Sequence, residues 1–296
     1  MPRRVALLVN PTAGKGRAAH VVAKVAAELR AADASVEILV GADAADAVAI
    51  AKQQVDLGVD ALVALGGDGM ANLALQAVAG TDTPFGLVAA GTGNDLAGAL
   101  GLPCKDPVAA ARLIAELLVA DQTRPMDAAR TEHGWFGCVL GAGFDSRVND
   151  RANRMTWPKG KSRYNLAILA ELRVFKPVPF VVTIDGERLE TEAMLVAVGN
   201  AATYGAGIRV CPDAVIDDGL LDVSILGPVS KVEFLRVFPK VYSGGHRDHP
   251  AVTMLRGREI RLEAAGVNAY ADGEYVGPLP MTCTVVPGAV HVLAPR

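Results

Sequence analysis

Short apolar runs alternate with segments of helical periodicity along the first part of the chain, and this alternation constrains the fold more than any other feature. Residues 5–9 form an apolar run closed by Asn10 and Pro11, which predicts a buried strand ending in a turn. Apolar positions recur at helical spacing over residues 17–32, which predicts a helix. Further strands are predicted at 36–40, 61–65 and 85–89, and further helices at 44–57, 70–78 and 107–119. This order indicates βαβ units and a mostly parallel sheet covered on both faces.

The pattern changes after Asp127. Short alternating segments bounded by turns replace the long periodic ones, which favours an antiparallel β domain, and Asp185-Gly186 is a hairpin turn signal. Strands are predicted at 135–140, 179–185, 193–198, 221–226, 251–255 and 259–263, and helices at 164–175 and 230–241. We therefore predict an α/β + β chain, with a three-layer α/β domain over residues 1–127 and a β-sandwich-like domain over residues 128–286.

Composition and charge narrow the classes of function. The 296 residues are 51% hydrophobic and 21% charged, which indicates packed cores and favours two domains. A net charge of -3 argues against a general nucleic-acid binder, because such proteins usually carry a basic excess. The four cysteines form no Cys-x-x-Cys pair, so we expect reduced thiols. No apolar run approaches the length of a membrane span or a signal peptide, which predicts a cytoplasmic protein whose contact with a membrane, if any, is peripheral.

Two glycine-rich loops follow neighbouring strands of the predicted sheet. Residues 66–69 read Gly-Gly-Asp-Gly, and residues 91–95 read Gly-Thr-Gly-Asn-Asp. Glycines let the backbone approach a ligand closely, and a following helix supplies free N–H groups suited to phosphate. Because the carboxyl ends of parallel strands meet at one edge, both loops are expected to face one crevice. The alternative for residues 66–69 alone is a tight turn capped by Asp68.

A third loop, residues 10–16, ends the first strand at the same edge. It lacks the first glycine of a P-loop at the right spacing, and Gly16 stands where Ser or Thr should hold magnesium. The P-loop NTPase interpretation is therefore rejected.

Five elements in this order resemble the catalytic domain of the diacylglycerol kinase family in its bacterial soluble form, a family that includes sphingosine and ceramide kinases. They are Asn10-Pro11 with its Gly-Lys-Gly loop and the segments 66–69, 91–97, 217–222 and 272–274. The resemblance implies an N-terminal domain like that of NAD and diacylglycerol kinases. It also implies that the C-terminal tail, about residues 287–296, packs back on this domain.

The resemblance further implies that ATP binds at the first three loops. Asp68 and Asp95 would belong to a carboxylate and water network around Mg²⁺ and the phosphates, and Asp127 matches another acid of that network, although a turn residue is the alternative for Asp127. The implied ATP-binding residues are Asn10, Pro11, Gly14, Gly66, Gly67, Asp68, Gly69, Met70, Asn72, Gly91, Thr92, Asn94, Asp95 and Asp127.

Catalytic and metal-binding roles are also implied by the resemblance. Glu274, with Asp272 beside it, would accept the proton of the attacking lipid hydroxyl. A surface hairpin turn is the alternative for this Asp-Gly-Glu segment. A structural Mg²⁺ would take a carboxylate oxygen from Asp218 and backbone carbonyls from Val215 and Leu220. An ordinary turn is the alternative there.

The chain departs from the family pattern near Val40, where relatives often have a nucleotide-binding Thr and this chain has no hydroxyl, and at two further positions. Met70 stands where the family usually has Thr, and Leu73 where Glu is common. A missing neutral hydrogen bond weakens nucleotide binding by about 0.5–1.5 kcal/mol. A catalytically weakened, lipid-binding pseudoenzyme therefore stays open.

A basic segment, residues 147–163, has six Lys or Arg side chains against one acid, Asp150, with Met155 and Trp157 between them. Such a segment suits docking on an anionic membrane surface, with a solvated helix face as the alternative. The expected function is transfer of the γ-phosphate of ATP to a lipid hydroxyl, with diacylglycerol giving phosphatidic acid. An NAD kinase-like or sphingoid-type kinase is the rival, no nucleic-acid partner is expected, and a homodimer is left open.

Overall fold

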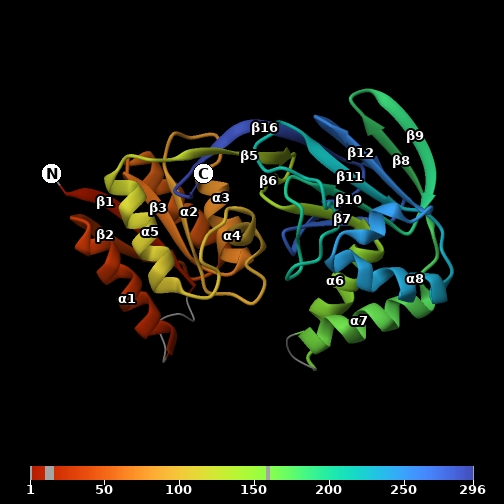
Figure 1. The fold of residues 1–296 in the computed structure, drawn as a ribbon, viewed down its shortest axis with the longest axis horizontal. Coiled ribbons are helices and arrows are strands. Elements are labelled where there is room, and N and C mark those ends of the chain that lie inside the picture. Colours follow the sequence, from red (N-terminus) through yellow and green to blue (C-terminus); the bar gives the residue numbers. More distant parts are fainter. Residues whose placement is uncertain (1, 11–16, 158–160, 296) are drawn as a thin grey trace. The chain divides into compact units, whose positions relative to one another are not determined.

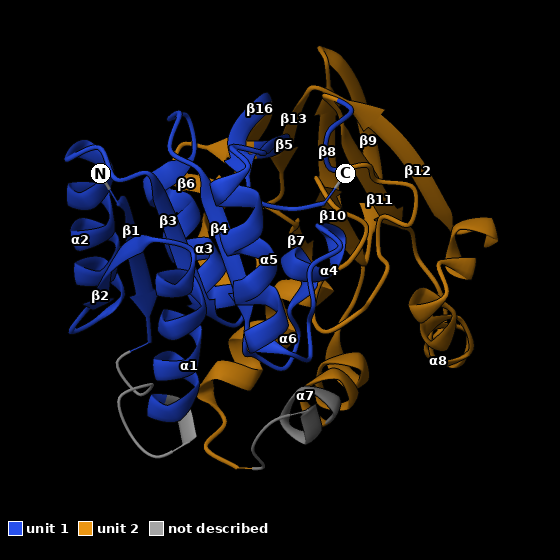
Figure 2. Cartoon of the chain, turned by 60° about the vertical axis from the view of Figure 1, so that its left-hand side comes forward, with its two compact units in different colours: residues 1–128, 216–218, 286–296 blue, residues 129–215, 219–285 orange. Residues whose placement is uncertain are grey.

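The computed structural model describes residues 2–10, 17–157 and 161–295. Pro11 and Gly14, two of the expected ATP-binding positions, lie outside the described residues. The chain forms two compact units, which Figure 2 shows in blue and orange. Unit 1 comprises residues 1–128, 216–218 and 286–296, and unit 2 comprises residues 129–215 and 219–285.

Unit 1 is built on a parallel sheet in the order β2-β1-β3-β4, which confirms the predicted mostly parallel sheet (Figure 1). The strands are β1 (Arg3–Val9), β2 (Ala34–Val40), β3 (Ala61–Gly66) and β4 (Phe85–Ala89). The helices are α1 (Arg17–Ala31), α2 (Ala44–Asp56), α3 (Asp68–Val78), α4 (Asp95–Ala99) and α5 (Pro107–Val119). Helices α1 and α5 pack together on one face, and α2 and α3 contact each other.

Apolar periodicity explains this arrangement. Val25 and Leu29 of α1 and Ile114 of α5 are fully buried in one core with the sheet residues Leu7 and Val63. A residue every three or four positions faces the sheet, so each helix buries one stripe and leaves the other face to solvent.

Unit 2 contains two sheets with a shared core. One is antiparallel in the order β12-β11-β10-β7-β14-β15. Its strands are β7 (Val139–Gly143), β10 (Leu195–Gly199), β11 (Leu221–Leu226), β12 (Val252–Gly257), β14 (Asn268–Ala271) and β15 (Glu274–Pro278). The other pairs β8 (Val178–Ile184) with β9 (Glu187–Ala193) and with β13 (Glu259–Glu263). Side chains from both sheets, such as Leu140 and Phe180, bury one another, which confirms the predicted antiparallel sandwich.

Three further strands, β5, β6 and β16, complete the sheets. The C-terminal strand β16 (Met281–Val292) pairs with β13 near its start and, at Val292, with Phe85 of β4. Strand β5 (Arg124–Thr131) pairs with β16 and with β6 (Gly134–Phe136).

Helices cover one side of unit 2. They are α6 (Phe144–Arg154), α7 (Lys161–Val174) and α8 (Lys231–Val237), followed by two short 3₁₀ helices, η2 (Phe238–Tyr242) and η3 (Gly245–Asp248). Phe144, Phe175 and Phe234 bring the three helices together through edge-on ring contacts at 5.0 and 5.4 Å.

Several element boundaries were predicted wrongly. The strand expected at 135–140 is two strands, because the backbone at Gly137 and Cys138 bonds to Asp272 instead of a neighbouring strand. The strand expected at 193–198 begins at Leu195. The helix expected at 230–241 leaves the α conformation after Val237, where Pro239 removes a backbone donor.

Candidate active site

The two glycine-rich loops of unit 1 lie against each other. Strands β3 and β4 pair in register up to Gly66 and Ala89, and the N–H of Ala90 donates to the carbonyl of Gly66 at 2.8 Å. A Cβ atom at Gly91 would lie 2.4 Å from the Cα of Gly67, a contact that real Cβ atoms do not make. The contact therefore requires glycine at residue 91, and the sequence expectation of neighbouring loops is met.

Asp68 ties these loops together through its carboxylate. One oxygen accepts the N–H of Asn94 at 2.8 Å, and the other accepts the N–H of Asp95 at 2.7 Å. Asp68 thus caps the start of α4 from the first turn of α3. Hydrogen bonds from donors to an ionised carboxylate are stronger than neutral ones, so this link holds the two loops in one arrangement.

Asn94 closes the second loop on itself. Its backbone is left-handed, with φ 59°, and its side-chain oxygen accepts the N–H of Gly91 at 2.9 Å. Its amide nitrogen donates to the carbonyls of Gly91 and Cys104 at 3.1 and 3.2 Å. Gly91 and Thr92 remain exposed at the tip of the loop. A rigid loop with an exposed backbone is the form that a phosphate-binding loop requires.

The start of α3 offers a second set of donors. Gly67 is its N-cap residue, and no side chain of the described residues caps this end. The first N–H groups of an α-helix have no partner within the helix, and the helix dipole favours negative charge beside them. Residues 67–69 therefore suit a phosphate.

Met70 and Asn72, both expected near the nucleotide, lie on α3. Met70 is buried and packs under the loop, since a Cβ at Gly66 would lie 2.4 Å from its Cγ. Asn72 is half-buried and its side-chain oxygen accepts the amide of Gln76 at 3.4 Å. Asn10 is exposed at the end of β1, next to β3.

Asp127 lies within strand β5, so the turn alternative is wrong for it. Its side chain is buried, and one carboxylate oxygen accepts the N–H of Gly288 at 2.8 Å. Its own N–H donates to the carbonyl of Ile216 at 2.9 Å. Asp127 thereby fastens the C-terminal strand and the segment 216–218 to unit 1.

The expected metal-binding residues belong to a turn before β11. Asp218 is exposed, and so is Val215, while Leu220 is half-buried. The neighbouring Asp217 forms an ion pair with Arg124 at 3.8 Å. Over the described part of the chain, no three His, Cys, Asp or Glu side chains cluster as metal ligands. A site here would therefore rely on backbone carbonyls beside the one carboxylate.

The acidic turn of unit 2 joins β14 to β15 in a two-residue hairpin. Asp272 and Gly273 have φ 52° and 87°, the left-handed values of a type I′ turn. The carboxylate of Asp272 accepts the N–H groups of Gly137, Cys138 and Val139 at 2.8, 3.0 and 3.1 Å. Asp272 is an anchor, and Glu274 beside it is exposed.

A second Asp-Gly-Glu hairpin occurs in the same unit, between β8 and β9. Asp185 and Gly186 have φ 50° and 90°. The Asp185 carboxylate accepts the N–H groups of Arg258 and Glu259 at 2.9 and 2.8 Å. The two turns are thus built alike, and the motif by itself specifies a hairpin rather than a reaction.

Asp145, which the sequence did not single out, stands at the start of α6. Burial raises the pKa of its carboxyl to about 6, and a hydrogen bond from the Tyr204 hydroxyl at 2.9 Å opposes this rise. Its carboxylate also accepts the amide of Asn149 at 3.3 Å. Gly141 is the residue in the sequence that points to Asp145. A Cβ at residue 141 would lie 2.5 Å from the Asp145 oxygen, so this position of the carboxylate requires glycine there.

The basic segment is divided between two helices. Arg147, Arg151 and Arg154 lie on α6, and Trp157 is 78% exposed beyond its end. Lys159 lies outside the described residues. The helices of the described residues include none with the length and hydrophobicity of a membrane span.

Comparison with known proteins gives consistent results along the whole chain. Residues 4–131 match the family described as "Diacylglycerol kinase catalytic domain". Residues 138–294 match the "YegS C-terminal NAD kinase beta sandwich-like domain". A diacylglycerol kinase of Mycobacterium tuberculosis is 42% identical over 299 residues, which cover 99% of this chain and 96% of the relative.

Solved structures share the fold. A diacylglycerol kinase from Bacillus anthracis superimposes with a TM-score of 0.76 at 23% identity, over 100% of this chain and 98% of that one. An NAD kinase from Archaeoglobus fulgidus, in complex with ATP, gives a TM-score of 0.56 at 12% identity, over 98% and 92% of the two chains. The family matches and the 42% identical relative show that the chain belongs to the diacylglycerol kinase family.

Proposed function

We propose that the chain is an ATP-dependent lipid kinase that transfers the γ-phosphate of ATP to a lipid hydroxyl, with diacylglycerol as the acceptor. The observation that carries the proposal is the glycine-only contact between the loops at Gly67 and Gly91, locked by Asp68. The names of the relatives support a kinase and, with the 42% identical protein, diacylglycerol as the acceptor.

The nucleotide is proposed to bind to unit 1. The exposed loop tip at Thr92 and the uncapped start of α3 at Gly67 present N–H groups to its phosphates. Asn10 lies at the end of the adjacent strand. The side chains of Asp68 and Asn94 accept hydrogen bonds from the backbone of the loops. Their contribution is therefore to hold the N–H donors in position before the nucleotide binds.

The transfer step is proposed to use Glu274 as the proton acceptor. The lipid hydroxyl oxygen forms a bond to the γ-phosphorus while the bond from that phosphorus to the β,γ-bridging oxygen breaks, and ADP leaves. The hydroxyl proton passes to the Glu274 carboxylate, which is exposed and so able to receive it. Asp272 is a positioning residue, since its carboxylate is occupied by three backbone N–H groups.

Magnesium fits the chemistry of the donors that the family resemblance implies. The turn at 215–220 offers oxygen atoms only, from the exposed Asp218 carboxylate and the backbone, and hard cations such as Mg²⁺ prefer oxygen. Near the phosphates, Mg²⁺ would neutralise charge that builds up during the transfer. The buried carboxyl of Asp95, at the start of α4, is the residue of unit 1 proposed to face it.

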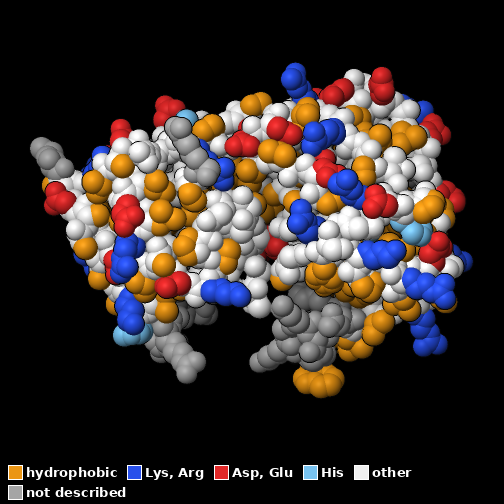
Figure 3. Space-filling model, viewed as in Figure 1, with side chains coloured by type: hydrophobic (Ala, Val, Ile, Leu, Met, Phe, Trp, Pro, Cys, Tyr) orange, Lys and Arg blue, Asp and Glu red, His pale blue; other side chains and the backbone are white. Residues whose placement is uncertain are grey.

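Docking on an anionic membrane surface is proposed as the way to reach the lipid. Trp157 is 78% exposed, and Leu166 and Leu169 of α7 are 44% and 56% exposed. Figure 3 shows hydrophobic side chains gathered, with Lys and Arg beside them, where Figure 1 places α7 and α8. Such a surface combines apolar insertion with attraction to anionic lipids.

Co-sedimentation with anionic vesicles tests the docking. Trp157→Ala should reduce the fraction of protein that sediments, whereas Trp135→Ala, which changes the other tryptophan, should not. Sedimentation that stays the same in Trp157→Ala, and also after neutralisation of the basic segment, would reject the surface.

The kinase assay uses labelled ATP, Mg²⁺ and a panel of acceptors: diacylglycerol, sphingosine, ceramide, polyprenol and NAD. Labelled phosphatidic acid as the main product is the expected result. A label in sphingoid or polyprenyl phosphate would keep the lipid kinase and change its acceptor. A label in NADP, or no product above background, would reject the proposed function.

A further inference from the structure

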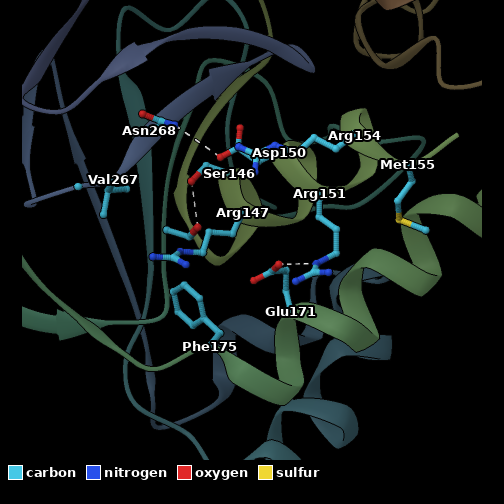
Figure 4. Close-up of a pocket in the computed structure, with 12 residues that line it drawn as sticks. Ser146, Arg147, Asp150, Arg151, Arg154, Met155, Glu171, Phe175, Val267 and Asn268 are labelled. Atoms are coloured by element: carbon cyan, nitrogen blue, oxygen red, sulfur yellow. Dashed lines mark hydrogen bonds and ion pairs between the residues drawn. The ribbon is translucent and has the colours of Figure 1, made fainter.

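A polar pocket of about 450 Å³ opens in unit 2 and takes no part in the proposed transfer (Figure 4). Three arginines of α6 line it: Arg147, Arg151 and Arg154. Spacings of four and three residues place them on one face of the helix. The opposite wall comes from Glu171 of α7, from Phe175 just after this helix and from Asn268 at the start of β14. All of these residues belong to one compact unit.

The two acids of the pocket already have partners. Glu171 is buried, with a side chain 7% exposed, and forms an ion pair with Arg151. Asp150 accepts the amide of Asn268 at 3.5 Å (Figure 4). It also accepts the hydroxyl of Tyr270 in β14 at 2.5 Å. Burial and this hydrogen bond raise the pKa of Tyr270 to about 12, so its hydroxyl stays a donor at neutral pH. Both carboxylates are thus occupied by donors of the protein.

Two arginines of the pocket remain without an acidic partner among the residues that the structure describes. The guanidinium of Arg147 lies over the ring of Phe175, 5.9 Å from its centroid. This contact uses the face of the guanidinium and leaves its N–H groups available in the plane. Arg154 is exposed and lies one helical turn beyond Asp150. It forms no ion pair with an acid of the described residues. Three cations and two acids leave the pocket with one net positive charge.

We propose that this pocket is a binding site for a phosphate group, held by the guanidinium groups of Arg147 and Arg154. Arginine presents parallel N–H donors that match two oxygens of a phosphate, which a lysine cannot do. The volume admits a phosphate with a glycerol attached, and the ligand class is therefore a phosphate ester. Two kinds of ligand carry such a phosphate ester: a free phosphate metabolite and the headgroup of an anionic phospholipid.

The wall of the pocket lies close to the acidic turn of unit 2. Asp150 on this wall accepts the Tyr270 hydroxyl, and the ring of Tyr270 contacts that of Tyr275 at 5.5 Å, next to Glu274. One hydrogen bond and one ring contact therefore separate the pocket from the acidic turn.

The binding test does not require catalysis, so it can fail or succeed independently of the kinase assay. Calorimetric titration with glycerol 3-phosphate is run on the full chain, on Arg147→Gln/Arg154→Gln and on Arg188→Gln/Arg261→Gln. The second pair loses the same charge from surface ion pairs with Glu190 and Glu263. Arg151 is left unchanged, because removing it would leave the buried Glu171 unpaired. Phosphate bound by the loops of unit 1 is a background common to all three proteins.

A second arm measures retention on phosphatidylcholine vesicles that contain phosphatidic acid or, at equal surface charge, phosphatidylglycerol. Arg147→Lys/Arg154→Lys is added because it keeps the charge and loses the paired donors. Far-ultraviolet circular dichroism confirms that each variant is folded.

The pocket variant is expected to lose binding by on the order of tenfold or more, since it loses the charge-assisted hydrogen bonds of two guanidinium groups. The lysine variant should lie between, and the control should match the wild type. A loss seen with glycerol 3-phosphate assigns the site to a free phosphate ester. A loss seen only with phosphatidic acid vesicles assigns it to a phospholipid headgroup. Equal binding by wild type and pocket variant in both arms overturns the proposal, as does retention that depends on vesicle charge alone.

Discussion

Asp68 and Asn94 are 26 residues apart in sequence, yet the carboxylate of Asp68 accepts the backbone N–H of Asn94 at 2.8 Å. A second bond, from the N–H of Asp95, completes the link at 2.7 Å. Asp68, which the family resemblance places in a carboxylate and water network around Mg²⁺ and the phosphates, thus connects the two loops in the structure. Its substitution should therefore affect the fold of unit 1 and nucleotide binding together.

Asp68→Asn should weaken binding of Mg-ATP and lower the stability of unit 1. An amide can accept only one of the two N–H groups, and the unpaired donor costs about 1–3 kcal/mol. Calorimetry with Mg-ATP and thermal unfolding measure the two effects. Asp56→Asn, an exposed acid at the end of α2, removes the same charge and should leave both unchanged. Equal behaviour of the two variants would contradict the connector role.

Gly91→Ala should separate the two loops. Its Cβ would lie 2.4 Å from the Cα of Gly67, and backbone atoms on both sides cannot yield as a flexible side chain would. A loss of nucleotide affinity of at least about tenfold is expected, because the phosphate-binding donors are displaced. Gly98→Ala is the matched control, since the nearest atom to its Cβ is the Cys104 sulfur at 4.0 Å. Nucleotide titration of both variants decides the matter, and tight binding by Gly91→Ala would argue against the contact.

Asp272→Asn and Asp185→Asn should both destabilise unit 2, by about 1–3 kcal/mol, because each acid accepts several backbone N–H groups. Only Asp272→Asn is expected to lower the turnover number, since it holds Glu274, and the KM for ATP should stay the same in both. Urea unfolding and steady-state kinetics separate the effects. A similar loss of turnover in both variants would mean that general destabilisation, not the position of Glu274, explains it.

Asp145 should make the stability of unit 2 depend on pH. Its pKa is raised from an ordinary 3.8 to about 6 by burial. The folded protein therefore binds a proton that the unfolded chain releases between these values, so stability falls as pH rises from about 4 to 6 and the loss is complete above 6. A tenfold change in proton affinity corresponds to about 1.4 kcal/mol, which makes the loss on the order of 3 kcal/mol.

Asp145→Asn tests this dependence. The variant should gain stability over the wild type as pH rises from 4 to 7, while its amide oxygen keeps the bond from Tyr204. The only two tryptophans, Trp135 and Trp157, are both in unit 2, so their fluorescence in urea reports its unfolding. A stability difference that does not change with pH would remove the role assigned to burial.

The parallel half of the fold and the position of its loops were predictable because the signals are local. Buried runs such as residues 61–65 end in glycines, and parallel strands bring such ends to one edge. The connection of Asp272 to Gly137 was not predictable, since the two residues are 135 positions apart. Helix α6 was foreseen only as the alternative of a solvated helix face over residues 147–163, because its apolar residues, Phe144, Val148 and Ala152, stand among charged ones.

In the candidate site too, local features could be predicted from the sequence, whereas contacts between distant residues could not. Glycine spacing in the sequence indicates where a backbone can approach a ligand, but not what each acid bonds to. Asp127 shows this limit, because only the structure reveals that it accepts the N–H of Gly288, 161 residues later. Met70 shows it again: in sequence it is a lost hydroxyl, whereas in the structure it packs beneath Gly66. The roles of these residues toward ATP remain predictions.

The central claim is that Glu274 receives the proton of the acceptor hydroxyl. Glu187 follows an Asp-Gly hairpin of the same geometry in the same unit and is exposed like Glu274, so it is a matched control. The decisive measurement is the rate of transfer from labelled ATP to diacylglycerol by Glu274→Gln and Glu187→Gln at saturating substrates. Glu274→Gln should lose about 10²–10⁴-fold in turnover while it still binds Mg-ATP, and Glu187→Gln should keep the wild-type rate. Comparable turnover of Glu274→Gln and the wild type would contradict the account.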